Sequence, residues 1–145
     1  MQRARYPVVT SDNPYVYTFI SEGPKGKIAK GIFYTPIEEN LYNLGFGDLN
    51  EDFSDLSDSS RSNNGDRDKV LTTVAFTALN FTSNFPDAII FIEGSTPART
   101  RLYQMGIAAN LVEINDNFII RGFVDDLWEV FQVGRNYEAF LVSRK

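Results

Sequence analysis

The sequence predicts an α+β fold with an antiparallel or mixed sheet, and three observations lead to this prediction. Segments that alternate in hydropathy and are rich in aromatic and β-branched residues fill the first third of the chain. Two stretches with helical spacing of apolar residues follow, separated by a short apolar run. The last third returns to short apolar segments between polar turns. This segregation of strands and helices favours α+β over repeated βαβ units.

The N-terminal segments are expected to form a three-stranded meander. Residues 15–23 (YVYTFISEG) and 27–37 (KIAKGIFYTPI) are the first two expected strands. The turn PKGK joins them, and Gly26 in it is free to adopt a positive φ. Residues 40–49 (NLYNLGFGDL) are the expected third strand.

A long helix and a central strand are expected next. Asp66 or Asp68 can cap a helix that runs to about Phe85, where Pro86 ends it. Residues 88–94 (AIIFIEG) are continuously apolar, which is typical of a central strand covered on both faces.

The C-terminal part of the chain is expected to hold a second helix and a strand-rich tail. The helix begins at Pro97. The tail strands are 111–114 (LVEI), 118–123 (FIIRGF), 128–131 (WEVF) and 137–145 (YEAFLVSRK). The length suits one domain over residues 1–145, with two main helices and no internal repeat.

The acidity of the chain is concentrated in one segment. The net charge is −5, and residues 48–68 carry seven acidic and two basic side chains, which leaves twelve of each elsewhere. Residues 50–62 hold few apolar groups, so a mobile acidic loop is expected there. The spacing of Asp48, Asn50 and Asp52 resembles a calcium loop, but glycine is missing from its sixth position and glutamate from its twelfth.

Composition excludes several kinds of chemistry. Cysteine and histidine are both absent, which removes disulfides, thiolate–zinc sites, a cysteine nucleophile and any Ser-His-Asp triad. We expect no bound metal and no cofactor, and we assign no catalytic residue. No apolar run approaches the roughly 18 residues of a membrane span. The opening MQRARYPVV lacks the apolar core of a signal peptide, so a bacterial-type cytoplasm is expected.

Residues 94–103 (GSTPARTRLY) form the strongest candidate site. Thr96 and Pro97 suit the start of a helix, whose positive dipole end disfavours nearby cations. Two arginines at that end therefore require an anion. The candidate anion-binding residues are Ser95, Thr96, Arg99, Arg101 and Tyr103. Arg99 and Tyr103 share a helix face, whereas Arg99 and Arg101 lie about 200° apart around the axis.

The anion has two candidate sources. The favoured one is internal, namely Glu93 at the end of the preceding strand, or Asp66 or Asp68 of the acidic segment. The other is an external phosphate or carboxylate group, which backbone N–H groups, hydroxyls and a guanidinium would hold together.

Two weaker candidates have ordinary structural explanations. The phrase NNGDRDK supplies Asn64, Gly65, Asp66 and Lys69, which suit either a ligand-binding turn or, as we favour, a turn with a helix cap. The hairpin with Lys25, Lys27 and Lys30 also carries aromatic residues, namely Tyr15, Tyr17, Phe19 and Tyr34. Basic and aromatic residues on an exposed sheet can bind single-stranded nucleic acid. We favour an ordinary half-buried meander whose lysines protect an edge.

Four phrases together resemble a known family. They are YVYTFISEGPKGKIAKGIFY, NLGFGD at 43–48, NNGDRDKVLTTV at 63–74 and GSTPARTRLY at 94–103. The chain is similar over nearly its whole length to an uncharacterised bacterial family, domain of unknown function 6934. The resemblance implies one compact domain and carries over no activity.

Three functions remain open from the sequence. The favoured one is a non-catalytic binding module, with a protein partner or an anionic ligand; nucleic acid is not favoured and no membrane is expected. The second is an enzyme acting on a phosphate-bearing substrate, which a convergence of Asp48, Asp66 and Glu93 would support. The third is an acidic protein whose segment 48–68 masks a partner or imitates nucleic acid.

Overall fold

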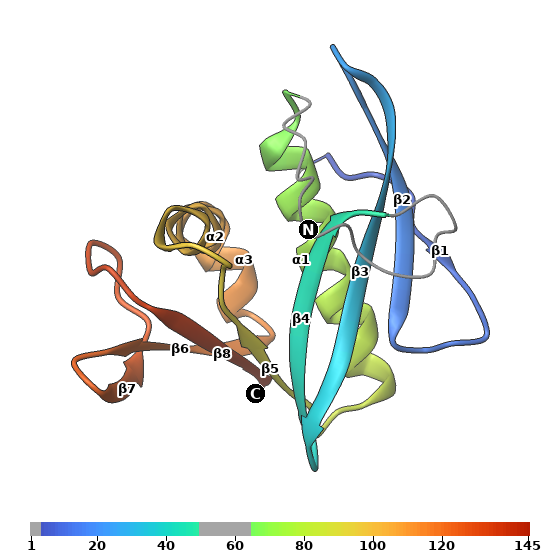
Figure 1. Cartoon of the computed structure of the whole chain (residues 1–145). Coiled ribbons are helices and arrows are strands. Elements are labelled where there is room, and N and C mark those ends of the chain that lie inside the picture. The colour runs from blue at the N-terminus through green and yellow to red at the C-terminus, as the bar shows by residue number, and fades with distance from the viewer. Residues whose placement is uncertain (1–3, 50–64) are drawn as a thin grey trace. The chain divides into compact units, whose positions relative to one another are not determined.

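The computed structural model describes residues 4–49 and 65–145 (Figure 1). Within these ranges three helices and an eight-stranded mixed sheet form the α+β fold that the sequence predicts. The strand order is β1-β2-β3-β4-β5-β8-β6-β7. The acidic loop predicted at 50–62 lies outside the described residues. None of the described helices is both long and apolar enough to cross a membrane.

The chain divides into two compact units. Unit 1 comprises Met1–Thr35 and Gly45–Phe81, and unit 2 comprises Pro36–Leu44 and Thr82–Lys145. The first strands and the first helix are β1 (Val9–Thr10), β2 (Val16–Gly23), β3 (Gly26–Glu38), β4 (Leu41–Asp48) and α1 (Arg67–Asn84). The predicted meander is therefore confirmed, and Gly26 opens β3 with φ 89°.

The core of unit 1 lies between the β2–β3 pair and α1. Tyr17 pairs with Ile32 in antiparallel register, and Tyr34 follows two residues later on the same face, so all three side chains point toward the helix. Phe81 of α1 stacks on the Tyr34 ring with 4.2 Å between ring centroids. Figure 1 shows α1 running along these strands. Tyr17, Phe19 and Tyr34 of the hairpin are therefore buried core residues and are not available as an exposed stacking surface.

Unit 2 contains the remaining elements. They are β5 (Ile89–Ile92), α2 (Pro97–Ala109), α3 (Leu111–Asn115), β6 (Phe118–Val124), β7 (Leu127–Val130) and β8 (Ala139–Arg144). β5 runs parallel to β4 and antiparallel to β8, and β6 lies between β8 and β7. Figure 1 shows α2 and α3 on one side of these strands.

The expectation that both faces of β5 are covered is wrong. Ile90 is fully buried on the helix-covered face, together with Phe140 and Val142 of β8. Its neighbours Ile89 and Phe91 point to the opposite face, where Ile89 remains 38% exposed and Phe91 half-buried. The run is continuously apolar because one face of β5 belongs to the core of unit 2. The other face is also apolar, although no described helix of unit 2 covers it.

The prediction of a strand at 111–114 is also wrong, because these residues form α3. The N–H of Ile114 donates to the carbonyl of Asn110 at 2.9 Å, which is the i to i−4 bond of an α-helix. Val112 is 83% exposed. Four residues are too few for the hydrophobic period to separate a strand from one helical turn.

Two substitutions of the same residue type test the one-sided burial of β5. Ile90→Ala should lower the free energy of unfolding by about 2–5 kcal/mol, as expected for a fully buried isoleucine. Ile89→Ala, one residue earlier in the same strand, should cost only about 1 kcal/mol, since part of that side chain already contacts water. Urea unfolding measures both, and equal losses would contradict the assignment of the two faces.

Candidate functional site

The strand-to-helix turn between β5 and α2 has the predicted geometry. Thr96 is the N-cap of α2, and its hydroxyl accepts from the N–H of Arg99 at 3.2 Å. Pro97 occupies the first helical position, as predicted. The turn is tight because Gly94 lies against the first turn of the helix: its N–H donates to the Thr100 hydroxyl at 2.9 Å. A Cβ at Gly94 would come within 2.4 Å of the Thr100 nitrogen, so only glycine fits.

Arg99 is held at this turn without a carboxylate. Its Nη1 donates to the Ser95 hydroxyl at 3.3 Å, and the side chain is half-buried. Within unit 2, Arg135 pairs with Asp125 and Glu129, and Arg99 forms no ion pair with a described residue of the unit. Glu93, the nearest acid in sequence, is exposed and forms no such pair. The internal ion pair favoured from the sequence is therefore not formed by the described carboxylates of this unit.

Arg101 and Tyr103 complete the set predicted from the sequence. Arg101 is exposed, and the helical rotation of about 200° points it away from the face that Arg99 occupies. Tyr103 follows one turn after Arg99 on the same face and is half-buried. The compact candidate set is therefore Ser95, Thr96 and Arg99.

The second candidate lies in unit 1, at the start of α1. Asn64 lies outside the described residues, and Gly65 has φ 73°. The carbonyl of Asp66 accepts from the Val70 N–H at 2.9 Å at the start of α1. The Asp66 carboxylate accepts from the hydroxyls of Tyr6 and Ser21, each at 2.5 Å. The Asp66 carboxylate therefore connects the start of α1 to Tyr6 and Ser21, and the turn-and-cap interpretation stays a prediction.

The same network fixes the chain that precedes β1. The Tyr6 hydroxyl also accepts from the Glu22 N–H at 3.0 Å, and Lys69 lies 4.1 Å from the centre of the Tyr6 ring. Burial raises the pKa of Tyr6, and its hydrogen bond to the Asp66 carboxylate raises it further. Ser21 is fully buried. A hydroxyl that is buried and hydrogen-bonded in this way is placed to support structure.

Two lysines of the unit 1 hairpin likewise contact acidic side chains of the same unit. Lys30 is buried and its ammonium lies 2.7 Å from the Asp48 carboxylate, which is buried too. Lys27 is exposed and lies 3.8 Å from Glu22. Asp48 and Asp66 are therefore engaged in separate contacts of unit 1, which is not the shared carboxylate pocket that a metal-dependent enzyme needs. The described residues contain no group of three or more acidic side chains suited to a metal ion.

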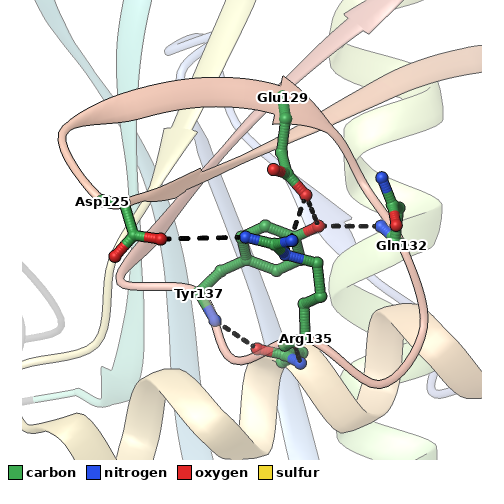
Figure 2. Close-up of polar contacts among 6 residues, drawn as sticks. Asp125, Glu129, Gln132, Arg135 and Tyr137 are labelled. Atoms are coloured by element: carbon green, nitrogen blue, oxygen red, sulfur yellow. Dashed lines mark hydrogen bonds and ion pairs between the residues drawn. The ribbon is translucent and has the colours of Figure 1, made fainter.

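A polar cluster around Tyr137 was missed by sequence reasoning (Figure 2). The Tyr137 hydroxyl donates to Glu129 Oε2 at 2.7 Å and accepts from the Gln132 N–H at 3.0 Å. Arg135 Nε lies 3.1 Å from the same Glu129 oxygen, and its guanidinium is 3.9 Å from Asp125. Figure 2 shows Glu129 and the Gln132 backbone nitrogen at the phenol oxygen, and Arg135 reaching both Glu129 and Asp125.

This cluster ties α2 to the strands of unit 2. Gln104 of α2 accepts from the Tyr137 N–H at 3.0 Å and donates to the carbonyl of Arg135. The Tyr137 ring lies on Gly122 of β6, where a Cβ would approach to 2.3 Å from the ring. Burial raises the pKa of Tyr137, with a further contribution from the Glu129 carboxylate. These contacts form only when the strands pair in this register and the loop before β8 takes this conformation. No local pattern in the sequence therefore predicts them.

The described residues thus form an α+β fold, in which Arg99 lies at the start of α2 and the carboxylates of Asp48, Asp66 and Glu129 bond to other side chains. The chain belongs to the family of unknown function DUF6934, whose model matches residues 2–145. The curated proteins and the solved structures that were searched give no match. The family resemblance stated from the sequence is thereby confirmed, and the function remains undetermined by the comparisons.

Tyr137→Phe tests the cluster and its dependence on pH. At pH 7 the substitution should cost about 1–2 kcal/mol, because a carboxylate and a backbone N–H each lose a partner. The unfolded phenol ionises near pH 10, whereas the folded pKa is raised above that value. Tyr137 therefore contributes a loss of stability in the wild type as the pH rises above about 10, and the variant lacks this contribution.

The measurement is urea unfolding of both proteins at pH 7 and at about pH 10.5, where the difference should be smaller. A double-mutant cycle with Glu129→Gln isolates the Tyr137–Glu129 contact from other effects of each change. A difference that grows with pH would contradict the assigned protonation.

Proposed function

We propose that this chain is a non-catalytic binding module of the bacterial cytoplasm that takes an anionic group at the N-terminus of α2. The observation that carries the proposal is the position of Arg99. Arg99 is a half-buried residue at the positive end of a helix, its hydrogen bond to Ser95 is exposed, and no described carboxylate of unit 2 pairs with it. A cation in that position is unfavourable by about 0.3–1 kcal/mol, which an anion would offset.

Three donors support the proposal. The Ala98 N–H, in the first turn of α2, has no hydrogen-bond partner among the described residues. The Ser95 hydroxyl accepts from Arg99, so its own proton is available to a ligand. The guanidinium of Arg99 retains further N–H groups. A phosphate or carboxylate group offers acceptors for all three.

The other two functions have less support. The enzyme considered from the sequence would need Asp48, Asp66 and Glu93 in one pocket, whereas Asp48 bonds to Lys30, and Asp66 bonds to Tyr6 and Ser21. A masking role would rest on the acidic segment, most of which lies outside the described residues. A cytoplasmic location agrees with a chain that has no cysteine to form disulfides.

Melting in sulfate tests the anion site with a matched pair of arginine variants. The melting temperature of the wild type should rise more in sodium sulfate or phosphate than in sodium chloride of equal ionic strength. Arg99→Ala should lose this excess, whereas Arg101→Ala, which removes a nearby exposed arginine from the same helix, should keep it. Arg99→Ala in chloride should be as stable as the wild type or a few tenths of a kcal/mol more stable.

The Arg101 variant also controls for exclusion of sulfate from the protein surface, which stabilises proteins without binding. Equal sulfate responses in Arg99→Ala and the wild type, together with a clear loss of stability in chloride, would show that Arg99 has a structural partner and no ligand.

A further inference from the structure

Two buried oxygen atoms at the junction of α2 and α3 have no hydrogen-bond partner among the described residues. They are Oδ1 of Asn110 and Oε2 of Glu113. Asn110 is only 7% exposed. Amide and carboxylate oxygens are both acceptors, so neither atom can bond to the other. Buried polar atoms without a partner destabilise a fold and are rare in native proteins, so a further group is expected to contact this pair.

The way the chain passes from α2 to α3 explains why the Glu113 oxygen lacks a partner. Asn110 is the N-cap of α3 and Glu113 its third residue, which is the spacing of a capping box. In a capping box the glutamate side chain reaches back and accepts from the N-cap N–H. Here Asn110 is also the C-cap of α2, and its N–H donates to the carbonyls of Gly106 and Ile107 at 3.3 and 3.2 Å. The usual donor for Glu113 is therefore already engaged.

The Asn110 side chain is oriented by α2 in the same way. Its Nδ2 donates to the carbonyl of Gly106 at 2.8 Å, which fixes the amide and leaves Oδ1 as the remaining acceptor. No side-chain cap hydrogen bond forms between Asn110 and α3. Residues three apart share a helix face, and the side chain at the third position reaches back toward the N-cap. This spacing places the two oxygens on the same side of the junction.

We propose that Asn110 Oδ1 and Glu113 Oε2 hold a monovalent metal cation such as sodium, with water completing its coordination. Carboxylate and amide oxygens are the ligands that hard metal cations take from proteins. A cation contacts both acceptors and also balances the charge of the carboxylate. A water molecule in the same place could donate to both oxygens, but it would leave that charge unbalanced.

The charges at the junction select a monovalent ion. Glu113 forms no ion pair with a described lysine or arginine, so the described part of the chain supplies no positive charge to it. One carboxylate balances one positive charge. A divalent ion would need further acidic ligands, and the described residues contain no group of three or more acidic side chains that could hold one.

The position in the fold also suits a cation. Asn110 directly follows the last residue of α2, where the unpaired carbonyl groups of a helix give its end a partial negative charge. Glu113 is half-buried and its neighbour Val112 is 83% exposed, so the pair lies close to the surface and within reach of ions in solution. Arg99 lies at the opposite end of α2, so the cation site does not depend on the proposed anion site.

Urea unfolding in chloride salts is the first test, with sodium replacing choline mole for mole so that ionic strength stays constant. Choline is too large to contact two buried oxygens at once. The unfolding equilibrium constant of the wild type should fall as sodium rises, by about tenfold when the sodium concentration reaches ten times its Kd. Glu113→Gln keeps the shape of the side chain and removes its charge, so it should lose this response. Its amide can donate to Asn110 Oδ1 in place of the ion.

The matched control is Glu138→Gln, which makes the same change at an exposed acid elsewhere in unit 2 and should keep the wild-type response. The second test measures binding to the folded protein directly. The sodium NMR resonance should broaden when the wild type or Glu138→Gln is added, and much less with Glu113→Gln. Circular dichroism confirms that each variant is folded.

Two results would overturn the proposal. One is a wild type whose unfolding is the same in sodium and in choline, which would show that water or a proton satisfies the two oxygens. The other is a Glu113→Gln variant that keeps the full response to sodium or the full line broadening, which would place the ion elsewhere. The first result needs no variant, so it decides the proposal even where Glu113→Gln does not fold.

Discussion

Alternation along the strands places every second side chain against a helix, and burial of that one face is the interaction on which each unit depends. In unit 1 the rings of Tyr17 and Tyr34 lie toward α1, and in unit 2 Ile90 and Phe140 lie on the helix-covered face. Each buried side chain of this size contributes about 1.5–3 kcal/mol, which must outweigh the cost of ordering the chain. The opposite face of the unit 2 strands has no such cover, and its apolar residues stay partly in contact with water.

The same burial constrains the polar residues. Lys30 and Asp48 are both buried, and separating such a pair costs about 3–5 kcal/mol because a charge is left without its partner. Asp66 holds Tyr6 and Ser21, and Glu129 holds Tyr137 and Arg135. These carboxylates therefore serve the fold. The Arg99 side chain, by contrast, donates to a neutral hydroxyl and pairs with no described carboxylate of unit 2.

The sequence predicts what depends on neighbours along the chain. The Thr96–Pro97 helix start, the turn at Gly26 and the meander follow from local preferences, and all three are confirmed. Features that depend on three-dimensional arrangement were not predictable. Tyr137 and Glu129 meet because the β7–β8 loop folds back on β6, and no spacing in the sequence encodes that contact. The apolar run at 88–94 also does not reveal which face a helix will cover.

The two sites proposed for unit 2 take ions of opposite charge, and this difference decides how salt experiments on them should be interpreted. Arg99 lies at the positive end of α2, whereas Asn110 lies at its negative end. Sodium sulfate contains two thirds of the sodium of sodium chloride at the same ionic strength, because each doubly charged sulfate counts fourfold. A cation held by Glu113 therefore stabilises the wild type less in the sulfate series and partly hides the effect of an anion held by Arg99. In a Glu113→Gln chain the cation contribution disappears, and the sulfate response that still depends on Arg99 belongs to the anion site alone.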